Sequence, residues 1–470
     1  MTTTASEGST ADRAVAVARL GRAAVRDLFT AGAPSSSDLH LVRSGDTHLL
    51  LVVNGSQLFE IDAGTFAAAA TATEAGDRDA TMRLLAELGV TGPRLVDDQP
   101  PAPPPVRALS LAIAQKCNLG CTYCYAQEGS FGDAPKDMSL ATALASVDLL
   151  LADARPGERA NLAFLGGEPL VGRAVLRAAT ERAATTAAAR GVALGLSITT
   201  NGTLLTEDDA AFFEAHGFSV TISIDGPRDV HDRLRPFKGG RGSFDVVIAR
   251  ARPLLARQRR MQVSARVTVT PRNLGLRATL DELIDLGFHG VGFSPMLRSP
   301  TGREEMEGEH LEQMLAAMVE CGLQTESQIV QGRRYPFSNL VTALRELHRG
   351  THRPYPCGAG AGYLGVSADG ELSACHRFVG DSRGAMGDIT TGVDDDRRAA
   401  WLAERHVHRQ EPCRSCWARY LCGGGCHHEA IGRGRPACGY IRGWLHYCLQ
   451  AYARLSSLRP EWFETAGPTP

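Results

Sequence analysis

The sequence has 470 residues, of which 43% are hydrophobic and 22% are charged, with a formal net charge of −2. This length exceeds what a single hydrophobic core supports, and the composition is typical of a soluble, multidomain globular protein. The near-zero net charge provides no electrostatic basis for binding nucleic acid or an anionic membrane, so neither is expected as a partner.

The N-terminal segment, residues 1–37, is predicted to form an amphipathic helix from about Ala11 to Phe29 and then a loose connector. No apolar run reaches the roughly 18 residues that a membrane-spanning helix needs. The basic start and apolar core of a signal peptide are also missing. We therefore expect a cytoplasmic protein, in which the twelve cysteines favour metal ligation over disulfides.

Residues 38–98 are predicted to form a small α+β unit. Two strand patterns, Leu49–Val53 and Gln57–Ile61, flank the turn signal Asn54-Gly55, and helical patterns follow. This order resembles the winged-helix-like elements that bind leader peptides of ribosomally made precursors. A structural cap on the next domain is the alternative. A proline-rich linker, residues 99–106, ends the unit.

Strand and helix patterns alternate across residues 107–321. This alternation predicts a partial (β/α)6 TIM-like barrel of the α/β class, with its chemistry at the carboxyl ends of the strands. Bridging helices are predicted over 322–356, and residues 357–470 form a cysteine-rich C-terminal domain with a final helix. The six predicted strands are Leu109–Ala114, Asn161–Leu165, Leu194–Thr199, Ser219–Ile224, Gln262–Thr270 and Gly290–Pro295.

Three cysteines, Cys117, Cys121 and Cys124, follow the first barrel strand directly. Thiolates at this spacing can hold three irons of a cubane cluster and leave the fourth iron open. A zinc site and three buried thiols are the alternatives, but structural zinc usually requires four ligands.

The loop and the strands around it resemble the radical S-adenosylmethionine (SAM) superfamily. The resemblance implies a [4Fe–4S] cluster on the three cysteines and SAM on the open iron. It also implies reductive cleavage of SAM to a 5′-deoxyadenosyl radical. The motif Gly166-Gly167-Glu168-Pro169 ends the second barrel strand. By resemblance, its glycines approach the cofactor closely, and Glu168 accepts a hydrogen bond from the SAM ammonium.

Three further residues are implied to bind cofactor or substrate. Ser223 and Asp225, at the end of the fourth strand, are candidates for ribose or substrate contacts. Arg266, on the fifth strand, resembles the basic residue that contacts the methionine carboxylate. The alternative for Arg266 is a salt bridge within the barrel.

The C-terminal cysteines form the pattern C-x12-G-x4-C followed by C-x2-C-x5-C-x3-C. They exceed what one zinc ion needs, although a two-zinc module is possible. The spacing resembles the SPASM extension of peptide-modifying radical SAM enzymes, which implies two auxiliary [4Fe–4S] clusters. Cys438 and Cys448 compete as the last ligand, since ten helical residues separate them by about 15 Å and one loop cannot easily present both. Cys438 is favoured because it precedes the helix, whereas Cys448 lies among apolar residues and suits a core thiol. The implied ligands are Cys357, Cys375 and Cys426 for the first cluster, and Cys413, Cys416, Cys422 and Cys438 for the second.

The stretch 125–132 and the tail from Cys422 to Trp444 resemble maturases of quinohemoprotein amine dehydrogenase, which join Cys sulfur to Asp or Glu carbons. We therefore expect a radical SAM peptide maturase that forms thioethers. Its expected partners are a precursor peptide or small protein subunit and an electron donor such as ferredoxin or flavodoxin. His376 occupies the position of the Asp proposed as the base in sulfatase-maturating relatives, which argues against formylglycine formation. The alternatives are a cyclophane-forming maturase and a non-catalytic electron carrier or peptide chaperone.

Overall fold

The computed structural model describes residue 26 and residues 28–29, 37–91 and 95–464. Most of the helix predicted for Ala11–Phe29 lies outside these residues. Among the described helices, none is long and apolar enough to cross a membrane.

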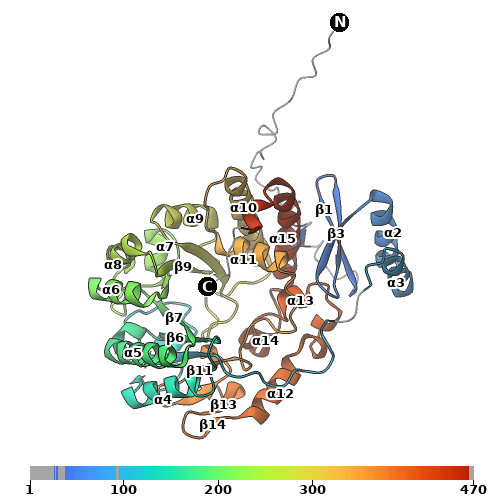
Figure 1. Cartoon of the computed structure of the whole chain (residues 1–470). Helices are drawn as coiled ribbons and strands as arrows, with labels where there is room; N and C mark the ends of the chain where they lie inside the picture. The colour runs from blue at the N-terminus through green and yellow to red at the C-terminus, as the bar shows by residue number, and fades with distance from the viewer. Residues whose placement is uncertain (1–25, 27, 30–36, 92–94, 465–470) are drawn as a thin grey trace.

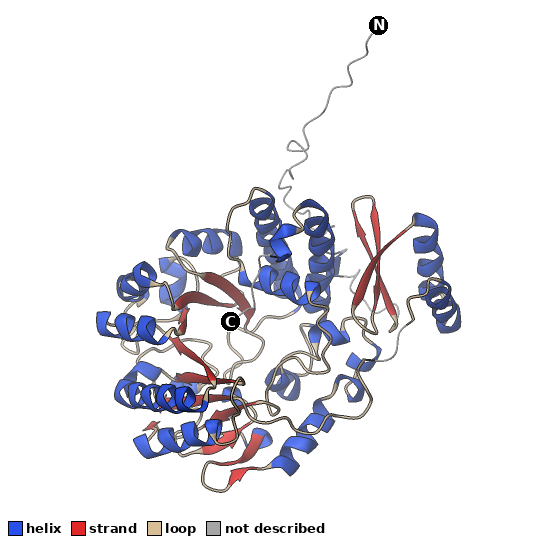
Figure 2. Ribbon diagram, viewed as in Figure 1, coloured by secondary structure: helices blue, strands red, loops and turns tan. Residues whose placement is uncertain are grey.

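A curved sheet of six parallel strands forms the centre of the molecule, with helices on its outer side (Figures 1 and 2). The strand order β10-β9-β8-β7-β6-β4 confirms the partial barrel. The strands are β4 (Ala108–Gln115), β6 (Arg159–Gly166), β7 (Ala193–Thr200), β8 (Ser219–Ser223), β9 (Gln262–Val269) and β10 (Gly290–Pro295). The helices are α4 (Leu140–Leu151), α5 (Arg173–Arg190), α6 (Glu207–His216), α7 (Arg228–Leu234), α8 (Phe244–Arg257) and α9 (Leu276–Asp285).

Side-chain alternation along the strands defines the two faces of this sheet. On β9, Val263, Ala265 and Val267 are buried in the main core, whereas Arg266 between them is exposed. Residues of successive strands that face the helices pack with them into one continuous core, and this burial is the main force that holds the barrel together. The opposite side chains face the interior of the partial barrel, where a substrate has access.

The C-terminal domain extends the barrel sheet, a continuation that the sequence did not predict. Strand β11 (Tyr363–Val366) pairs in parallel with β4, and three short strands continue the sheet in antiparallel order. These are β12 (Glu371–Ser373), β13 (Ala385–Asp388) and β14 (Gly392–Val393), and the short β5 (Lys136–Asp137) pairs with β4. The first C-terminal cysteines are therefore fixed to the barrel by backbone hydrogen bonds.

An antiparallel sheet in the order β1-β2-β3 forms the N-terminal unit, followed by two helices. Its elements are β1 (Leu39–Ser44), β2 (Thr47–Val52), β3 (Gln57–Ile61), α2 (Ala63–Glu74) and α3 (Arg78–Glu87). The predicted hairpin corresponds to β2 and β3, whereas the sequence analysis did not identify β1. This sheet packs against the C-terminal domain, because Val42 and Leu51 share a buried cluster with Trp417 and Tyr420.

The remaining helices connect and cover these parts. Helices α10, α11 and α15 lie together beside β1 (Figure 1). Short helices carry most of the later cysteines. The bounds are α10 (Gly308–Val330), α11 (Ser338–His348), α12 (Asp395–Arg405), α13 (Arg419–Cys422), α14 (His427–Arg433), α15 (Cys438–Leu458) and α16 (Glu461–Glu464).

Candidate active site and cysteine groups

The three-cysteine loop leaves the carboxyl end of β4. Cys117, Cys121 and Cys124 are each partly buried; the Cys117 thiol is influenced electrostatically by Cys124, and the Cys121 thiol by both of the others. Burial raises the pKa of Cys117, and burial raises the pKa of Cys121 to about 12. Buried thiolates in close proximity repel one another and need a nearby positive charge, which iron supplies when it is bound. The loop therefore suits the cluster expected from the sequence.

Two glycines let the backbone after β6 approach this loop closely. A Cβ at Gly167 would lie 2.7 Å from the Cα of Gly129, and a Cβ at Gly129 would lie 2.6 Å from the Cα of Gly167. Gly129 also adopts a φ of +95°, which side chains other than glycine rarely tolerate. The Gly166-Gly167 motif thus supports the start of the cysteine loop, because the Lys116 backbone lies against Gly129 and Gly167.

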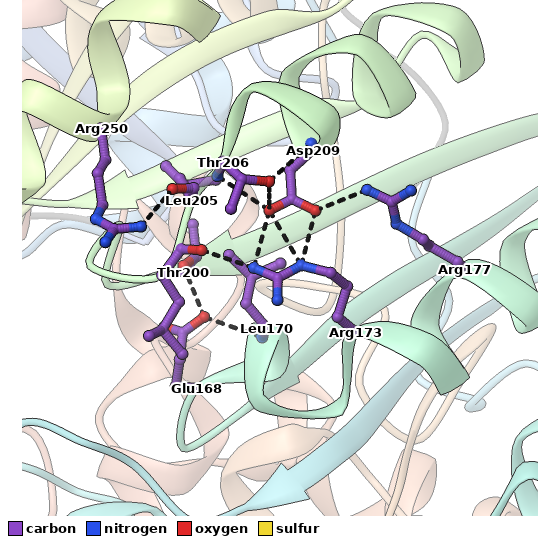
Figure 3. Close-up of polar contacts among 10 residues, drawn as sticks. Glu168, Leu170, Arg173, Arg177, Thr200, Leu205, Thr206, Asp209 and Arg250 are labelled. Carbon is purple, nitrogen blue, oxygen red and sulfur yellow. Dashed lines mark hydrogen bonds and ion pairs between the residues drawn. The ribbon is translucent and has the colours of Figure 1, made fainter.

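Glu168 links this motif to the end of β7 (Figure 3). Its carboxylate is fully buried and accepts hydrogen bonds from the Thr200 hydroxyl at 2.8 Å and the Asn201 backbone N–H at 2.7 Å. The backbone N–H of Leu170 donates a third bond, at 3.0 Å. Burial raises the pKa of Glu168, and these hydrogen bonds oppose that effect. A carboxylate offers about four acceptor positions, so little capacity remains for the SAM ammonium that the resemblance implies.

Asn201 connects the same strand end to the first cysteine. Its side-chain amide lies 3.6 Å from the Sγ of Cys117 and donates to the Oδ1 of Asn118 at 2.9 Å. The loop that carries Asn201 is itself fixed by Arg173, which donates to Asp209 at 2.9 Å and to the Leu204 carbonyl at 2.6 Å (Figure 3). Helices α5 and α6 therefore hold the strand-end motif in place.

Asp225 follows the end of β8, as the sequence analysis expected, and takes part in a buried network. It is fully buried, and the Tyr123 hydroxyl donates to its Oδ2, while the Thr268 backbone N–H donates to Oδ1 at 2.9 Å. The Arg235 guanidinium donates to the Tyr123 hydroxyl at 2.7 Å and lies 3.8 Å from Asp225. Sequence reasoning missed Arg235, since no motif marks a lone arginine after a short helix. The network ties the cysteine loop to β8 and β9.

The other two expected cofactor residues face the barrel interior. Ser223 lies partly buried at the end of β8. The Arg266 guanidinium has no hydrogen bond or ion pair with any described residue, so the barrel salt bridge considered as its alternative is not formed with that part of the chain. Although solvent reaches Arg266, the protein around it partly desolvates the guanidinium and lowers its pKa. An unpaired guanidinium inside the barrel suits an anionic group of a cofactor or substrate.

The structure brings together Cys357, Cys375 and Cys426. Cys375 is affected electrostatically by both of the others, and burial raises its pKa to about 12. Cys375 follows β12, and Cys426 directly precedes α14. Cys357 and Cys426 are exposed, whereas Cys375 is buried.

A second set of four cysteines surrounds a cavity of about 60 Å³. Cys438, at the start of α15, lines this cavity, whereas Cys448 is buried in the main core further along the same helix. Burial and the neighbouring Glu326 raise the pKa of Cys448. Cys321 is likewise buried, within α10. The four cysteines of this set are Cys413, Cys416, Cys422 and Cys438, and Cys426 of the first group also lines the cavity.

A tyrosine lies between the three-cysteine loop and the group formed by Cys357, Cys375 and Cys426. Tyr125 directly follows Cys124 and is influenced by the thiols of both Cys124 and Cys375. The Arg377 guanidinium lies over its ring, 5.0 Å from the ring centroid. Beside it, the Tyr363 hydroxyl lies 2.9 Å from the Nδ1 of His376. The cysteine loop and the first C-terminal group therefore lie next to each other, although more than 200 residues separate them in the sequence.

The cysteine groups do not form single-ion sites. Within the described ranges, no three Cys, His, Asp or Glu side chains are arranged to hold one metal ion. Zinc would draw four ligands to about 2.0–2.3 Å from one centre. A cubane instead spaces its cysteines over separate irons, so these groups suit clusters better than the zinc alternatives.

Comparison with known proteins agrees with this site. Residues 111–273, which run from β4 to just beyond β9, match the profile of the radical SAM superfamily. The serine-type anaerobic sulfatase-maturating enzyme of Klebsiella aerogenes is 26% identical over 361 residues, which cover 73% of this chain and 85% of that protein. The chain is thus an enzyme with a radical SAM domain, and its cofactors are SAM and [4Fe–4S] clusters.

Solved structures share the fold over most of the chain. The structure of anSMEcpe with bound AdoMet and the Cp18Cys peptide has a TM-score of 0.61 at 20% identity, and covers 76% of this chain and 100% of its own. Streptococcus suis SuiB bound to the precursor peptide SuiA has a TM-score of 0.51 at 14% identity, and covers 85% of this chain and 97% of its own.

Proposed function

We propose that this radical SAM enzyme is a peptide maturase that joins a Cys sulfur to a side-chain carbon of Asp or Glu within one substrate chain. One observation carries the proposal. The first C-terminal group contains three cysteines, two of them exposed, and lies beside the cysteine loop through Tyr125. A cluster on three cysteines leaves one iron for a substrate thiolate.

The proposal assigns the cysteines to three clusters. Cys117, Cys121 and Cys124 hold the SAM-binding cluster; Cys357, Cys375 and Cys426 hold the first auxiliary cluster. Cys413, Cys416, Cys422 and Cys438, at the small cavity, hold the second auxiliary cluster. When bound, SAM and its cluster supply a 5′-deoxyadenosyl radical that removes a hydrogen atom from a C–H bond. Arg266 is assigned to the SAM carboxylate and Ser223 to the ribose, while Tyr125 and Arg377 position the substrate between the two sites.

The overall reaction balances without a further oxidant from the protein. The C–S bond forms as one C–H and one S–H bond break. One hydrogen atom leaves in 5′-deoxyadenosine, and the other leaves as a proton and an electron. The electron passes to an acceptor such as ferredoxin or flavodoxin, which also supplies the electron that cleaves SAM.

Two similarities support a peptide substrate. The SuiB structure that shares the fold contains a precursor peptide, and the anSMEcpe structure contains the Cp18Cys peptide. The N-terminal unit adds a plausible docking surface, because β3 pairs only with β2 among the described strands. An extended leader peptide that pairs with β3 would use the main-chain groups at this edge.

The test uses anaerobically reconstituted protein, SAM, dithionite and a candidate precursor peptide that contains Cys together with Asp or Glu. We expect a product that has lost a pair of hydrogens, in which one thiol is blocked from alkylation. Deuterium from a labelled Asp or Glu side chain should appear in 5′-deoxyadenosine. The variant in which Cys117, Cys121 and Cys124 are all Ala serves as the control and should form neither product.

A product that loses the same hydrogens but keeps every thiol open to alkylation would contradict thioether formation. That result would favour the carbon–carbon cyclophane reaction. Absence of 5′-deoxyadenosine from the native protein would instead contradict a catalytic role and favour an electron carrier.

A further inference from the structure

A polar cavity of about 330 Å³ lies where three functional segments meet. Tyr125 comes from the segment after the cysteine loop, and Arg298 from the segment after β10. Arg377 follows Cys375, and His428 follows Cys426 closely. Each segment that lines the cavity begins at a cysteine group or at the end of a barrel strand. A ligand in this cavity therefore lies close to the proposed SAM-binding cluster and to the proposed first auxiliary cluster.

Arg298 brings a positive charge to this cavity without a compensating anion. Its side chain has no ion pair or hydrogen bond with the part of the chain that the structure describes. The guanidinium lies against Gly432 on α14, where any Cβ would collide with it. Glycine at position 432 therefore leaves the space that the Arg298 guanidinium occupies.

Two neighbouring side chains carry buried nitrogens without an acceptor. The Nε of Arg377 and the Nδ1 of His428 are buried and have no hydrogen-bond partner among the described residues. Arg377 pairs with Glu429 at 2.5 Å, so its own charge is already balanced. Arg383, a further lining residue, pairs with Asp381 at 2.5 Å. Burial of polar groups without partners is costly, which indicates that a bound group supplies the acceptors.

We infer that this cavity binds one carboxylate of the substrate peptide, the side chain of an Asp or Glu, through Arg298, Arg377 and His428. The inference rests on the proposed function, since it identifies the residue that the peptide presents beside the reaction centre. Arg298 alone is uncompensated among the cavity's charged groups, so the site suits a single negative charge. A planar carboxylate matches the fork of donors on a guanidinium. The Nδ1 of His428 is buried without a hydrogen-bond partner among the described residues, so a bound carboxylate oxygen can accept a hydrogen bond from it.

The test measures equilibrium binding of two blocked Gly/Ala peptides to the reconstituted full-length enzyme with SAM. One peptide has a central Asp and the other has Asn at the same position. Native enzyme should bind the Asp peptide about tenfold or more tightly than the Asn peptide, which is the usual scale for a charge-assisted hydrogen bond. Arg298→Gln should remove this preference, and Arg298→Lys should retain part of it. Arg182→Gln, which affects an exposed ion pair with Asp148 on the barrel helices, should preserve it.

Several outcomes would overturn the inference. These are equal binding of both peptides by native enzyme, an unchanged preference in Arg298→Gln, or no binding of the Asp peptide up to its solubility limit. A parallel loss of SAM affinity in Arg298→Gln would show that the cavity holds the SAM carboxylate instead. SAM cleavage without peptide should be unchanged in the control variant Arg182→Gln. Crosslinking without a preference for Asp would reject the cavity assignment alone, and Asp binding without crosslinking would reject the proposed reaction alone.

Discussion

At the scale of single residues, two cysteines of α15 are chemically alike but differ in their surroundings. Cys438 lines the small cavity with four other cysteines, and Cys448 lies in the apolar core. Cys438→Ala should therefore lower the iron content from about twelve to about eight per chain, because one of three cubanes is lost. Cys448→Ala should keep all of the iron. Iron analysis and electron paramagnetic resonance of both variants provide the measurement; equal iron loss would contradict the assignment of Cys438.

Another residue-scale prediction concerns the buried network behind the cysteine loop. Tyr123→Phe removes the hydroxyl that donates to Asp225 and accepts from Arg235. Both partners stay buried, so the free energy of unfolding should fall by about 1–3 kcal/mol. The midpoint of anaerobic thermal unfolding reports this change. Tyr452→Phe is the matched control, since it removes a solvent-exposed bond to His348 and should cost at most about 0.5 kcal/mol. Equal effects of the two substitutions would argue against the network.

At the scale of elements, the outer edge of β3 is the proposed docking site for a leader peptide. Successive residues of a strand direct their backbone groups to opposite sides, so only one of Leu58 and Phe59 donates toward β2. Proline at whichever of these two positions directs its N–H away from β2 should preserve the thermal midpoint, because no sheet hydrogen bond is lost. That variant should still cleave SAM without peptide but fail to modify a full-length precursor. Unchanged precursor turnover by both proline variants would contradict leader docking on β3.

At the scale of the whole molecule, the N-terminal sheet is held against the C-terminal domain partly by two buried histidines. The Nε2 of His40 lies 2.9 Å from the Nδ1 of His446, and the His40 ring stacks on Trp417 with centroids 3.7 Å apart. Burial lowers the pKa of His40, and burial lowers the pKa of His446 to about 4. Both histidines are therefore neutral in the docked state.

This interface should weaken as pH falls. Below the ordinary histidine pKa of about 6.5, the undocked state binds protons that the docked state excludes. The docking free energy should thus be complete above that pH and decrease progressively toward pH 4. Near pH 5.5 the loss should be about 1.4 kcal/mol for each histidine. Hydrogen exchange of β1, corrected for its intrinsic rate, measures the effect, and His446→Leu should show a smaller pH dependence. Exchange that is independent of pH would contradict this prediction.

Much of this protein was determined by the sequence itself. The alternation of apolar strands and helices predicted the partial barrel, because a parallel sheet buried on its helical face needs that pattern. The spacing of Cys117, Cys121 and Cys124 predicted the cluster loop, since those thiolates are local in the chain and need no distant partner. The pattern also placed Gly166, Gly167 and Glu168 at a strand end.

Only the tertiary structure decided which distant groups meet. Strands β11–β14 were missed because short strands acquire their identity from the sheet they extend, in this case β4. Asp225 lies 3.8 Å from Arg235, a partner that no motif marks and whose position depends on how α7 packs. Arg298 stood out in no motif, and its unpaired charge appears only once the loop after β10 lies against α14. A side chain's residue type is local, whereas its burial, its charge balance and its partners are properties of the folded chain.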